Sequence, residues 1–598
     1  MKLKQSIFYI IAICIPFIIL LVTEGVLRLS GYGYTYPLFV PSAQLDGYLQ
    51  PNPVLVKRYF APNGNVPSVS PDTFLFTKNK PAGTFRIVTM GGSTMAGFPY
   101  GRFGSPAGML QQRFKGTHPS SNIEIISVAM SSINSYTLLD ITEEVIAIDP
   151  DAILIYAGHN EYLGIMGVGS VYASKGGHGA NLMYLALKEV RLFQLIQSIY
   201  QSWFGDEINN LQNNDPQRTV MAQVAKNKAI NYNDEVYAAG LEQFTQNLGA
   251  ILQSFKQANI PVMVGNLVAN ERDQVPFESV SNEDLNKASS SLLLLDASAL
   301  NEKTIAQADK LAHADYFYAA AMYLATQKQD LKAHEYFIKA MDYDLLRFRA
   351  PSQFNTIIGN SAEEHGATLV DVHDFIHKRT TPFIAYNVML EHLHPNRRGY
   401  FLLSEAFYES LIETLISPAE YKINSMQAWQ LSPLTEVDEI YATYKITQLT
   451  SDYPFSDYKK KVNKPKASGA LSQIAIDRIN GATWISTQQA LLAYYQKNNK
   501  TERAANVAGV LFDAIPNQHN TARVASLLYL RANILPFAKY YALKAVSLNK
   551  ADVNYRLTLA EIYFKLGNKT QSLATLNSVL AIEPNNQRAK QIKTQISR

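Results

Sequence analysis

A serine in a glycine-rich turn is the first residue of the chain suited to covalent chemistry. Ser93 stands in Gly91-Gly92-Ser93-Thr94, immediately after the apolar run 85–90 and before a helical pattern over 107–114. Two glycines allow a sharp strand-to-helix turn and leave the serine exposed at the carboxyl end of the strand. The segment therefore predicts a nucleophile, with a capping serine or an anion-binding loop as the alternatives.

Two further segments supply groups that could activate such a serine. Asn160 ends Gly158-His159-Asn160 after the apolar run 152–156, and its amide can face a developing oxyanion or form a local turn. Farther along, the chain carries Glu391-His392-Leu393-His394-Pro395. A carboxylate three residues before His394 can bond its Nδ1 and leave Nε2 free as a base. The alternative for this segment is a solvated polar loop.

Histidine and carboxylate groups also raise the question of a metal. Glu391, His392 and His394 are possible ligands, but no further ligand cluster accompanies them at a characteristic spacing. His373 and His377 are four residues apart, as in metal-binding helices, yet no glutamate–histidine motif surrounds them. We interpret this second pair as surface residues, and the sequence predicts no metal.

The elements that must position these residues alternate between apolar strands and amphipathic helices. Helical periodicity is clearest over 238–258, where apolar residues recur on one face. Such alternation implies a mostly parallel sheet covered on both sides, and hence an α/β domain. Five runs have the composition of strands: 85–90, 123–128, 152–156, 260–264 and 367–372.

Together these segments resemble the SGNH hydrolases, also called the GDSL esterase/lipase superfamily. Gly92-Ser93-Thr94 occupies the nucleophile block, Gly158-His159-Asn160 matches G-x-N, and 391–395 matches D-x-x-H-P with glutamate in place of aspartate. The glycine that completes the family's oxyanion hole has its nearest counterpart in Ala129. The resemblance covers about residues 84–415 and implies a three-layer, flavodoxin-like domain with a mostly parallel sheet.

The resemblance also implies a mechanism, that of a serine esterase. Ser93 would attack an ester carbonyl, His394 would accept and later return its proton, and Glu391 would orient His394. The N–H groups of Ser93 and Ala129, with the Asn160 side chain, would hold the oxyanion. No metal or organic cofactor is needed. The same machinery could instead transfer an acyl group to a sugar hydroxyl.

The C-terminal segment repeats with a period of 34 residues. Large and small side chains recur at this spacing, as two packed helices per unit require. The pattern resembles a tetratricopeptide array and predicts an all-α domain that binds a protein partner. A shorter copy, at about 303–345, lies inside the α/β region as an insertion. The recurring positions are Tyr495, Tyr529 and Tyr563, then Ala504, Ala538 and Ser572, then Ala508, Ala542 and Leu576.

The N-terminus carries the signal for a compartment. An apolar run over residues 7–23 is near the low end of a membrane-spanning helix. We interpret it as an uncleaved signal anchor, the alternative being a cleaved signal peptide. Cys14, the only cysteine, lies in this run, so disulfides and thiolate zinc sites are excluded. A net charge of +4 over 598 residues argues against nucleic acid as a partner.

The sequence thus predicts an esterase acting on an acyl ester, with a cell-envelope glycan as the substrate class. The stretch Ile155-Tyr156-Ala157-Gly158-His159-Asn160-Glu161-Tyr162 is similar to bacterial membrane-anchored members of this superfamily that also carry tetratricopeptide repeats. This resemblance, with the apolar N-terminal run, implies a single-pass inner-membrane location with the bulk of the chain periplasmic or otherwise extracytoplasmic. The alternative is a scaffold protein that uses its repeats and a degenerate α/β module. The predicted units are an anchor at 1–28, an extension at 29–83, the α/β domain at 84–415, a connector at 416–480 and the repeats at 481–598.

Overall fold

A parallel five-stranded sheet lies at the centre of the α/β domain, with the strand order β5-β4-β6-β7-β8. The computed structural model describes residues 2–60, 66, 69–169, 177–211, 221, 229–280, 301–380 and 382–597. The strands lie where the apolar runs predicted them. Their bounds are Thr84–Gly91 for β4, Asn122–Ser127 for β5, Ala152–Tyr156 for β6, Val262–Gly265 for β7 and Thr368–Val370 for β8.

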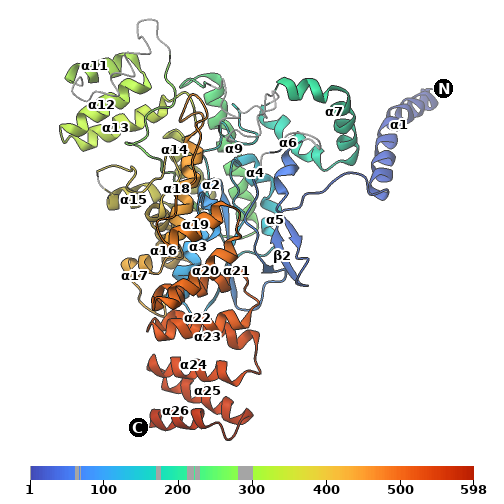
Figure 1. The fold of residues 1–598 in the computed structure, drawn as a ribbon. Helices are drawn as coiled ribbons and strands as arrows, with labels where there is room; N and C mark the ends of the chain where they lie inside the picture. The colour runs from blue at the N-terminus through green and yellow to red at the C-terminus, as the bar shows by residue number, and fades with distance from the viewer. Residues whose placement is uncertain are drawn as a thin grey trace.

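Helices cover both faces of this sheet. Helices α3 (Pro106–Thr117) and α16 (Arg397–Thr414) pack together on one face, and α9 (Glu235–Gln257) and α14 (Gln353–His365) pack together on the other. Strand β6 is buried along its whole length, as expected of a parallel strand covered on both sides. The three-layer α/β fold predicted from the sequence is therefore confirmed (Figure 1).

The N-terminal extension contains a small sheet that the sequence did not predict. Its three antiparallel strands are β1 (Phe39–Pro41), β2 (Tyr48–Pro51) and β3 (Phe76–Thr77). Strands of two to four residues are too short to show an alternating pattern, and their pairing depends on residues far apart in the chain. This sheet lies beside the α/β domain in Figure 1.

Two helical excursions interrupt the α/β pattern. The first consists of α6 (Gly177–Lys188) and α7 (Arg191–Leu211). The second lies between β7 and β8 and comprises α11 (Glu302–Leu311), α12 (Ala314–Thr326) and α13 (Asp330–Asp342). Its core is formed by aromatic and alanine side chains, among them Phe317 and Phe337. This second excursion is the predicted repeat-like insertion, and it projects from the body of the molecule in Figure 1.

The C-terminal part is entirely helical, as predicted. Tyr495, Tyr529 and Tyr563 are buried at equivalent positions of successive helix pairs, because each pair packs on the next. The pairs are α20 (Trp484–Lys497) with α21 (Thr501–Ala514), α22 (His519–Arg531) with α23 (Leu535–Leu548), and α24 (Val553–Lys565) with α25 (Lys569–Ile582), and α26 (Gln587–Ser597) follows them. The predicted connector contributes α17 (Ser425–Gln430), α18 (Glu436–Thr450) and α19 (Ala470–Ile479). Helix α18 packs on α19, and α19 packs on α20.

The repeats are attached to the α/β domain through helix α3. Lys115 of α3 forms a buried ion pair with Asp513 of α21. Gly116, the next residue of this helix, lies so close to Phe537 that a Cβ on the glycine would be 2.7 Å from the ring. Phe103, just before α3, stacks on Trp484 with ring centroids 4.7 Å apart. These contacts join the two parts of the chain into one body.

Helix α1 (Lys2–Leu29) contains the predicted anchor. Among the residues whose side chains the structure describes, no helix is both long enough and apolar enough to cross a membrane. The predicted segment 7–23 lies partly outside these residues, since the side chains of residues 2–12 are not described. Cys14 is exposed on this helix.

Candidate active site

The carboxyl ends of three neighbouring strands bring the first site residues to one edge of the sheet. Strand β4 ends at Gly91, and the short helix α2 (Ser93–Ala96) follows at once. Ala129 follows β5, and Asn160 follows β6. The Met130 N–H donates to the Gly91 carbonyl at 3.1 Å, which ties the loop after β5 to the turn that carries Ser93. Parallel strands place these three loops side by side.

A serine, a histidine and a glutamate form a continuous hydrogen-bonded chain at this edge. The Oγ of Ser93 lies 2.7 Å from Nε2 of His394. On the other side of the ring, Nδ1 of His394 contacts Oε1 of Glu391. The same carboxylate oxygen accepts the His394 backbone N–H at 2.9 Å. This arrangement fixes the histidine tautomer with its proton on Nδ1, and leaves Nε2 to accept the Ser93 proton.

The second oxygen of Glu391 contacts His392, a residue that the sequence analysis named as a possible metal ligand. Oε2 accepts the His392 backbone N–H at 2.7 Å and contacts Nδ1 of the His392 ring. Both Glu391 and His392 are buried. Glu391 therefore closes the loop 391–394 on itself as well as orienting His394. An acceptor with two oxygens is suited to serve two rings and two N–H groups at once.

Asn270, which the sequence analysis did not predict as a site residue, holds this loop through hydrogen bonds to its backbone. Its N–H donates to the His392 carbonyl at 2.8 Å, and its Nδ2 donates to the Glu391 carbonyl at 3.2 Å. Asn270 is fully buried, so these contacts satisfy polar groups that water cannot reach. The signal that could have found it is an asparagine shortly after a buried strand, which is common in loops and weak by itself.

Burial sets the charge state of the histidine that contacts Ser93. It lowers the pKa of His394 to about 3, because the charged imidazolium would lose its hydration. The Phe98 ring, with its centroid 4.7 Å from that of His394, forms part of the apolar cover. His394 is therefore neutral near pH 7 and able to accept a proton. Ser93 itself is only half-buried, so a substrate can approach its hydroxyl.

His159 belongs to the frame of the site. Burial lowers its pKa to about 3. Its Nε2 lies 3.1 Å from the Val268 carbonyl, and its Nδ1 accepts the Ala350 N–H at 3.2 Å. One ring nitrogen thus contacts backbone shortly after β7, and the other contacts backbone shortly before α14. His159 positions loops around the site and takes no part in the serine–histidine–glutamate chain.

Asn160 lies directly beside the nucleophile turn. A Cβ built on Gly92 would lie 2.9 Å from Nδ2 of Asn160. The amide donates to the Ile133 carbonyl at 3.0 Å, which orients the side chain, and the residue remains half-buried. Ala129 is buried at the same edge. The structure thus gathers the predicted residues Ser93, Asn160, Glu391 and His394 around one point, with Ala129 on the adjoining loop.

The candidate metal ligands divide into two groups among the described residues. Glu391, His392 and His394 have ligand atoms within 4.8 Å of one another, but His394 already contacts Ser93 through one nitrogen and Glu391 through the other. His373 was interpreted as a surface residue, and this is wrong: it is half-buried and bonded to Glu271 at 3.0 Å. His377 is half-buried as well and belongs to the second group. The pattern misled because the partner carboxylate is about a hundred residues away in the chain.

Comparison with known proteins supports the same division of the chain. A tetratricopeptide-repeat family model matches residues 538–596. No curated protein sequence matches the chain. The α/β domain has the parallel sheet and the ordered site residues that the resemblance to the SGNH hydrolases led us to expect. The C-terminal part combines the tetratricopeptide match with the buried 34-residue pattern.

Several solved structures resemble one part or the other. The acetyl xylan esterase AlAXEase is 12% identical, covers 55% of this chain and 100% of its own, and has a TM-score of 0.27. Axe2, an acetylxylan esterase from Geobacillus stearothermophilus, is 13% identical over 55% of this chain and 94% of its own, with a TM-score of 0.27. The first tetratricopeptide domain of Spaghetti (RPAP3), bound to an HSP90 peptide, is 22% identical over 19% of this chain and 90% of its own, with a TM-score of 0.18. These likenesses are distant.

Proposed function

We propose that the chain is a serine esterase with Ser93 as nucleophile. The observation that carries the proposal is the 2.7 Å contact between Ser93 Oγ and Nε2 of a neutral, buried His394. His394 takes the hydroxyl proton as Oγ attacks the acyl carbon, and returns it to the oxygen of the leaving alcohol. Water then repeats the sequence on the acyl-enzyme and releases the acid. Glu391 holds the ring orientation throughout and stabilises the imidazolium that forms.

The oxyanion hole in this proposal consists of the Ser93 N–H, the Ala129 N–H and the Asn160 amide. Its support is the position of all three groups at the carboxyl edge of neighbouring strands, with Asn160 Nδ2 next to Gly92. Donors fixed by the backbone need no rearrangement as negative charge develops on the carbonyl oxygen. Alanine at position 129 supplies the same N–H as the glycine of the resembled family.

Replacing the nucleophile tests the proposal directly. The full chain should react with a fluorophosphonate probe and hydrolyse p-nitrophenyl acetate, whereas Ser93→Ala should do neither. The matched control is Ser547→Ala, which changes an exposed serine of helix α23 and should leave both reactions at the parent level. Equal labelling of the parent and Ser93→Ala would contradict the proposal.

The substrate class that we propose is an O-acyl ester of a cell-envelope glycan. A glycan requires an open approach, and the half-buried positions of Ser93 and Asn160 are compatible with one. Release of acetate from acetylated polysaccharides, compared with cleavage of long-chain acyl esters, measures this preference. Adding a sugar acceptor to the same assay distinguishes hydrolysis from acyl transfer, because transfer consumes the ester without releasing the acid.

We further propose the location predicted from the sequence, with the catalytic domain on the extracytoplasmic side of a bacterial inner membrane. Support comes from the described half of α1, where apolar side chains from Ile13 to Val22 are exposed, including Leu21 at 72%. Exposed apolar patches of this kind favour transfer into lipid. Cell fractionation of the full chain and of a variant lacking residues 1–28 tests the proposal, and recovery of both in the same fraction would contradict it.

A partner of the repeats is the remaining proposal about function. Stacked helix pairs of this kind present a continuous surface that suits a protein or peptide ligand. In the scaffold alternative this surface would carry the whole function. Cells in which Ser93→Ala fully replaces the parent would favour the scaffold, whereas cells that lose function with Ser93→Ala would favour the esterase.

A further inference from the structure

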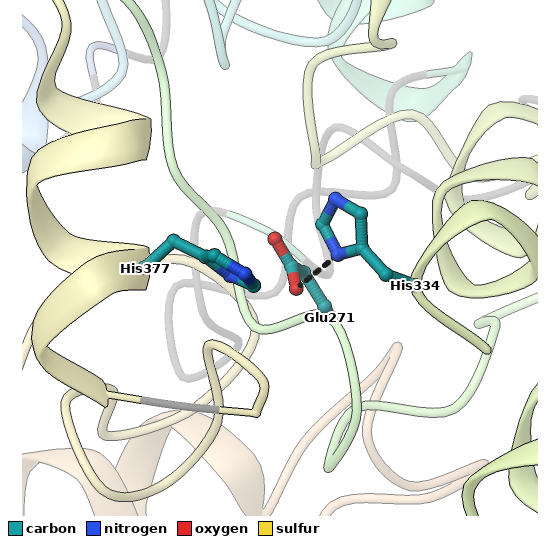
Figure 2. Close-up of side chains that lie close together, drawn as sticks. All are labelled: Glu271, His334 and His377. Carbon is teal, nitrogen blue, oxygen red and sulfur yellow. Dashed lines mark hydrogen bonds and ion pairs between the residues drawn. The ribbon is translucent and has the colours of Figure 1, made fainter. Parts of the chain in front are cut away.

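A second cluster of chemically active side chains lies outside the serine–histidine–glutamate site. Glu271 is on the segment that follows β7, His334 is on α13 of the insertion, and His373 and His377 are on α15 (Val372–Thr380). Figure 2 shows the helices of His334 and His377 facing each other across Glu271. Three parts of the chain that are far apart in sequence thus converge on one carboxylate.

The contacts in this cluster are short and involve both carboxylate oxygens. Oε2 of Glu271 lies 3.1 Å from Nδ1 of His334, and Oε1 lies 3.0 Å from Nε2 of His373. One ligand atom from each of Glu271, His334 and His377 can be chosen so that all three lie within 4.8 Å of one another. The Nδ1 atom of His377 is buried and has no hydrogen-bond partner within the described part of the chain.

The burial of the carboxylate favours a positive charge beside it. The Glu271 side chain is 1% exposed, and an unpaired buried carboxylate is costly. The neighbouring imidazoles provide a cation only when they are protonated. A divalent ion would neutralise the carboxylate at any pH at which the histidines are neutral, and would use the unpaired nitrogen of His377.

We propose that Glu271, His334 and His377 bind one divalent transition-metal ion of the zinc class. Two imidazole nitrogens and one carboxylate oxygen form a donor set that suits zinc and leaves a further position open for water. His373 holds the other carboxylate oxygen and so acts as a positioning residue that orients the ligand.

Such an ion would fasten the insertion to the α/β domain next to the catalytic loop. His334 belongs to the insertion, whereas His377 belongs to the helix after β8. Glu271 directly follows Asn270, whose N–H and amide hold the carbonyls of His392 and Glu391. The metal would therefore stabilise the segment on which the loop 391–394 rests.

The experiment is a metal titration of the full chain, after treatment with a chelator and dialysis. Addition of Co²⁺ should produce the visible absorption bands of a cobalt ion bound by nitrogen and oxygen ligands. The absorbance should stop rising at one Co²⁺ ion per chain, and Zn²⁺ should abolish the bands by displacing the cobalt. His334→Ala and His377→Ala should lose this saturable binding, and His373→Ala should weaken it by about 10–100-fold. The matched control is His365→Gln, which changes a half-buried histidine of α14 and should titrate as the parent does.

Three further variants keep the outcome decisive. Glu271→Gln preserves the size of the buried side chain, so a folded protein that no longer binds the ion would support the proposal without relying on the alanine variants. His394→Ala tests the other ligand group, and loss of Co²⁺ binding in that variant alone would place the ion at Glu391 and overturn the proposal. Absence of stoichiometric binding in the parent, or equal binding in His377→Ala, would also overturn it. Ser93→Ala should bind the ion fully, so this result is independent of the esterase.

Discussion

Glu391 has more partners than an orienting carboxylate needs. One oxygen serves the ring and the N–H of His394, and the other serves the ring and the N–H of His392. The longer side chain of glutamate, compared with aspartate, allows this arrangement in which one carboxylate closes a short loop. The residue therefore contributes to catalysis through His394 and to stability through the backbone.

These two contributions predict opposite rankings for two substitutions. His394→Ala removes the base, whereas Glu391→Ala removes only the group that orients it, so Glu391→Ala should retain about 10–100-fold more activity. Glu391→Ala should nevertheless be the less stable protein, since it leaves two buried N–H groups unpaired at about 1–3 kcal/mol each. Initial rates and thermal melts of both variants check the two rankings, and a Glu391→Ala protein as inactive as His394→Ala would assign the carboxylate a larger catalytic part.

The charge state of His394 predicts an unusual pH profile. A general base works only when neutral, so activity falls as the pH drops through its pKa, and burial lowers that of His394 to about 3. The kcat/KM for p-nitrophenyl acetate should therefore stay nearly constant from pH 8 down to about 5, where a histidine of ordinary pKa near 6.5 would have lost most of its activity. A half-maximal rate near pH 6.5 would contradict this, provided that circular dichroism shows a folded protein at both ends of the range.

At the scale of elements, the turn after β4 depends on two adjacent glycines with different neighbours. A Cβ on Gly91 would lie 2.2 Å from the carbonyl oxygen of Tyr156 in β6. A Cβ on Gly92 would instead lie 2.9 Å from the flexible amide of Asn160. The first glycine thus allows the strands to approach, and the second leaves room for an oxyanion donor.

The two glycine variants should consequently fail in different ways. Gly91→Ala clashes with the backbone and should lower the free energy of unfolding of the α/β domain by about 1–3 kcal/mol. Gly92→Ala should leave the stability close to that of the parent and lower kcat by about 10–100-fold, because the Asn160 amide is displaced. Gly359→Ala in α14, where the nearest atom is 3.9 Å away, is the control. A Gly92→Ala enzyme with full kcat would remove Asn160 from the proposed oxyanion hole.

The elements also show how far sequence reasoning reaches. All five sheet strands could be predicted because each is a short apolar run bounded by glycine or polar residues, and the alternation with helices implied their parallel order. Ser93 and Asn160 could be placed at one edge because each closely follows a strand. His394 was placed there by the resemblance to the SGNH hydrolases, since helix α15 separates it from β8. Asn270 and the partners of His373 and His377 could not be predicted, because these contacts join segments whose approach depends on the path of a long insertion. The second role of Glu391, toward the adjacent His392, depends on the local conformation of the loop 391–394.

For the whole molecule, the joint between the repeats and the α/β domain is built around helix α3. The ion pair of Lys115 with Asp513 is buried there, and Gln112 of the same helix donates to Asn506 at 3.0 Å. Burial lowers the pKa of Lys115, an effect that Asp513 opposes. Removing one member of a buried ion pair leaves the other charge buried without a partner, and this destabilises the protein.

Breaking this pair should therefore be far more costly than replacing it. Asp513→Ala leaves Lys115 charged and buried and should destabilise the joint by about 3–5 kcal/mol, whereas the double variant Lys115→Met with Asp513→Leu should be near the parent. Hydrogen exchange of amides in α3 and α21 measures the effect locally. Glu561→Ala, which breaks the exposed pair with Arg588 in the repeats, should change exchange by less than about 1 kcal/mol. Similar losses in Asp513→Ala and Glu561→Ala would show that the buried pair does not hold the joint.

The position of Cys14 has a practical consequence for all of these experiments. It is the only cysteine of the chain, and it is exposed on the N-terminal helix α1, which lies at one side of the molecule in Figure 1. A maleimide dye or spin label would attach to this one atom of the native protein, without any cysteine having to be removed. The environment of the N-terminal helix could then be followed spectroscopically while the serine, the histidines and the repeats keep their natural residues.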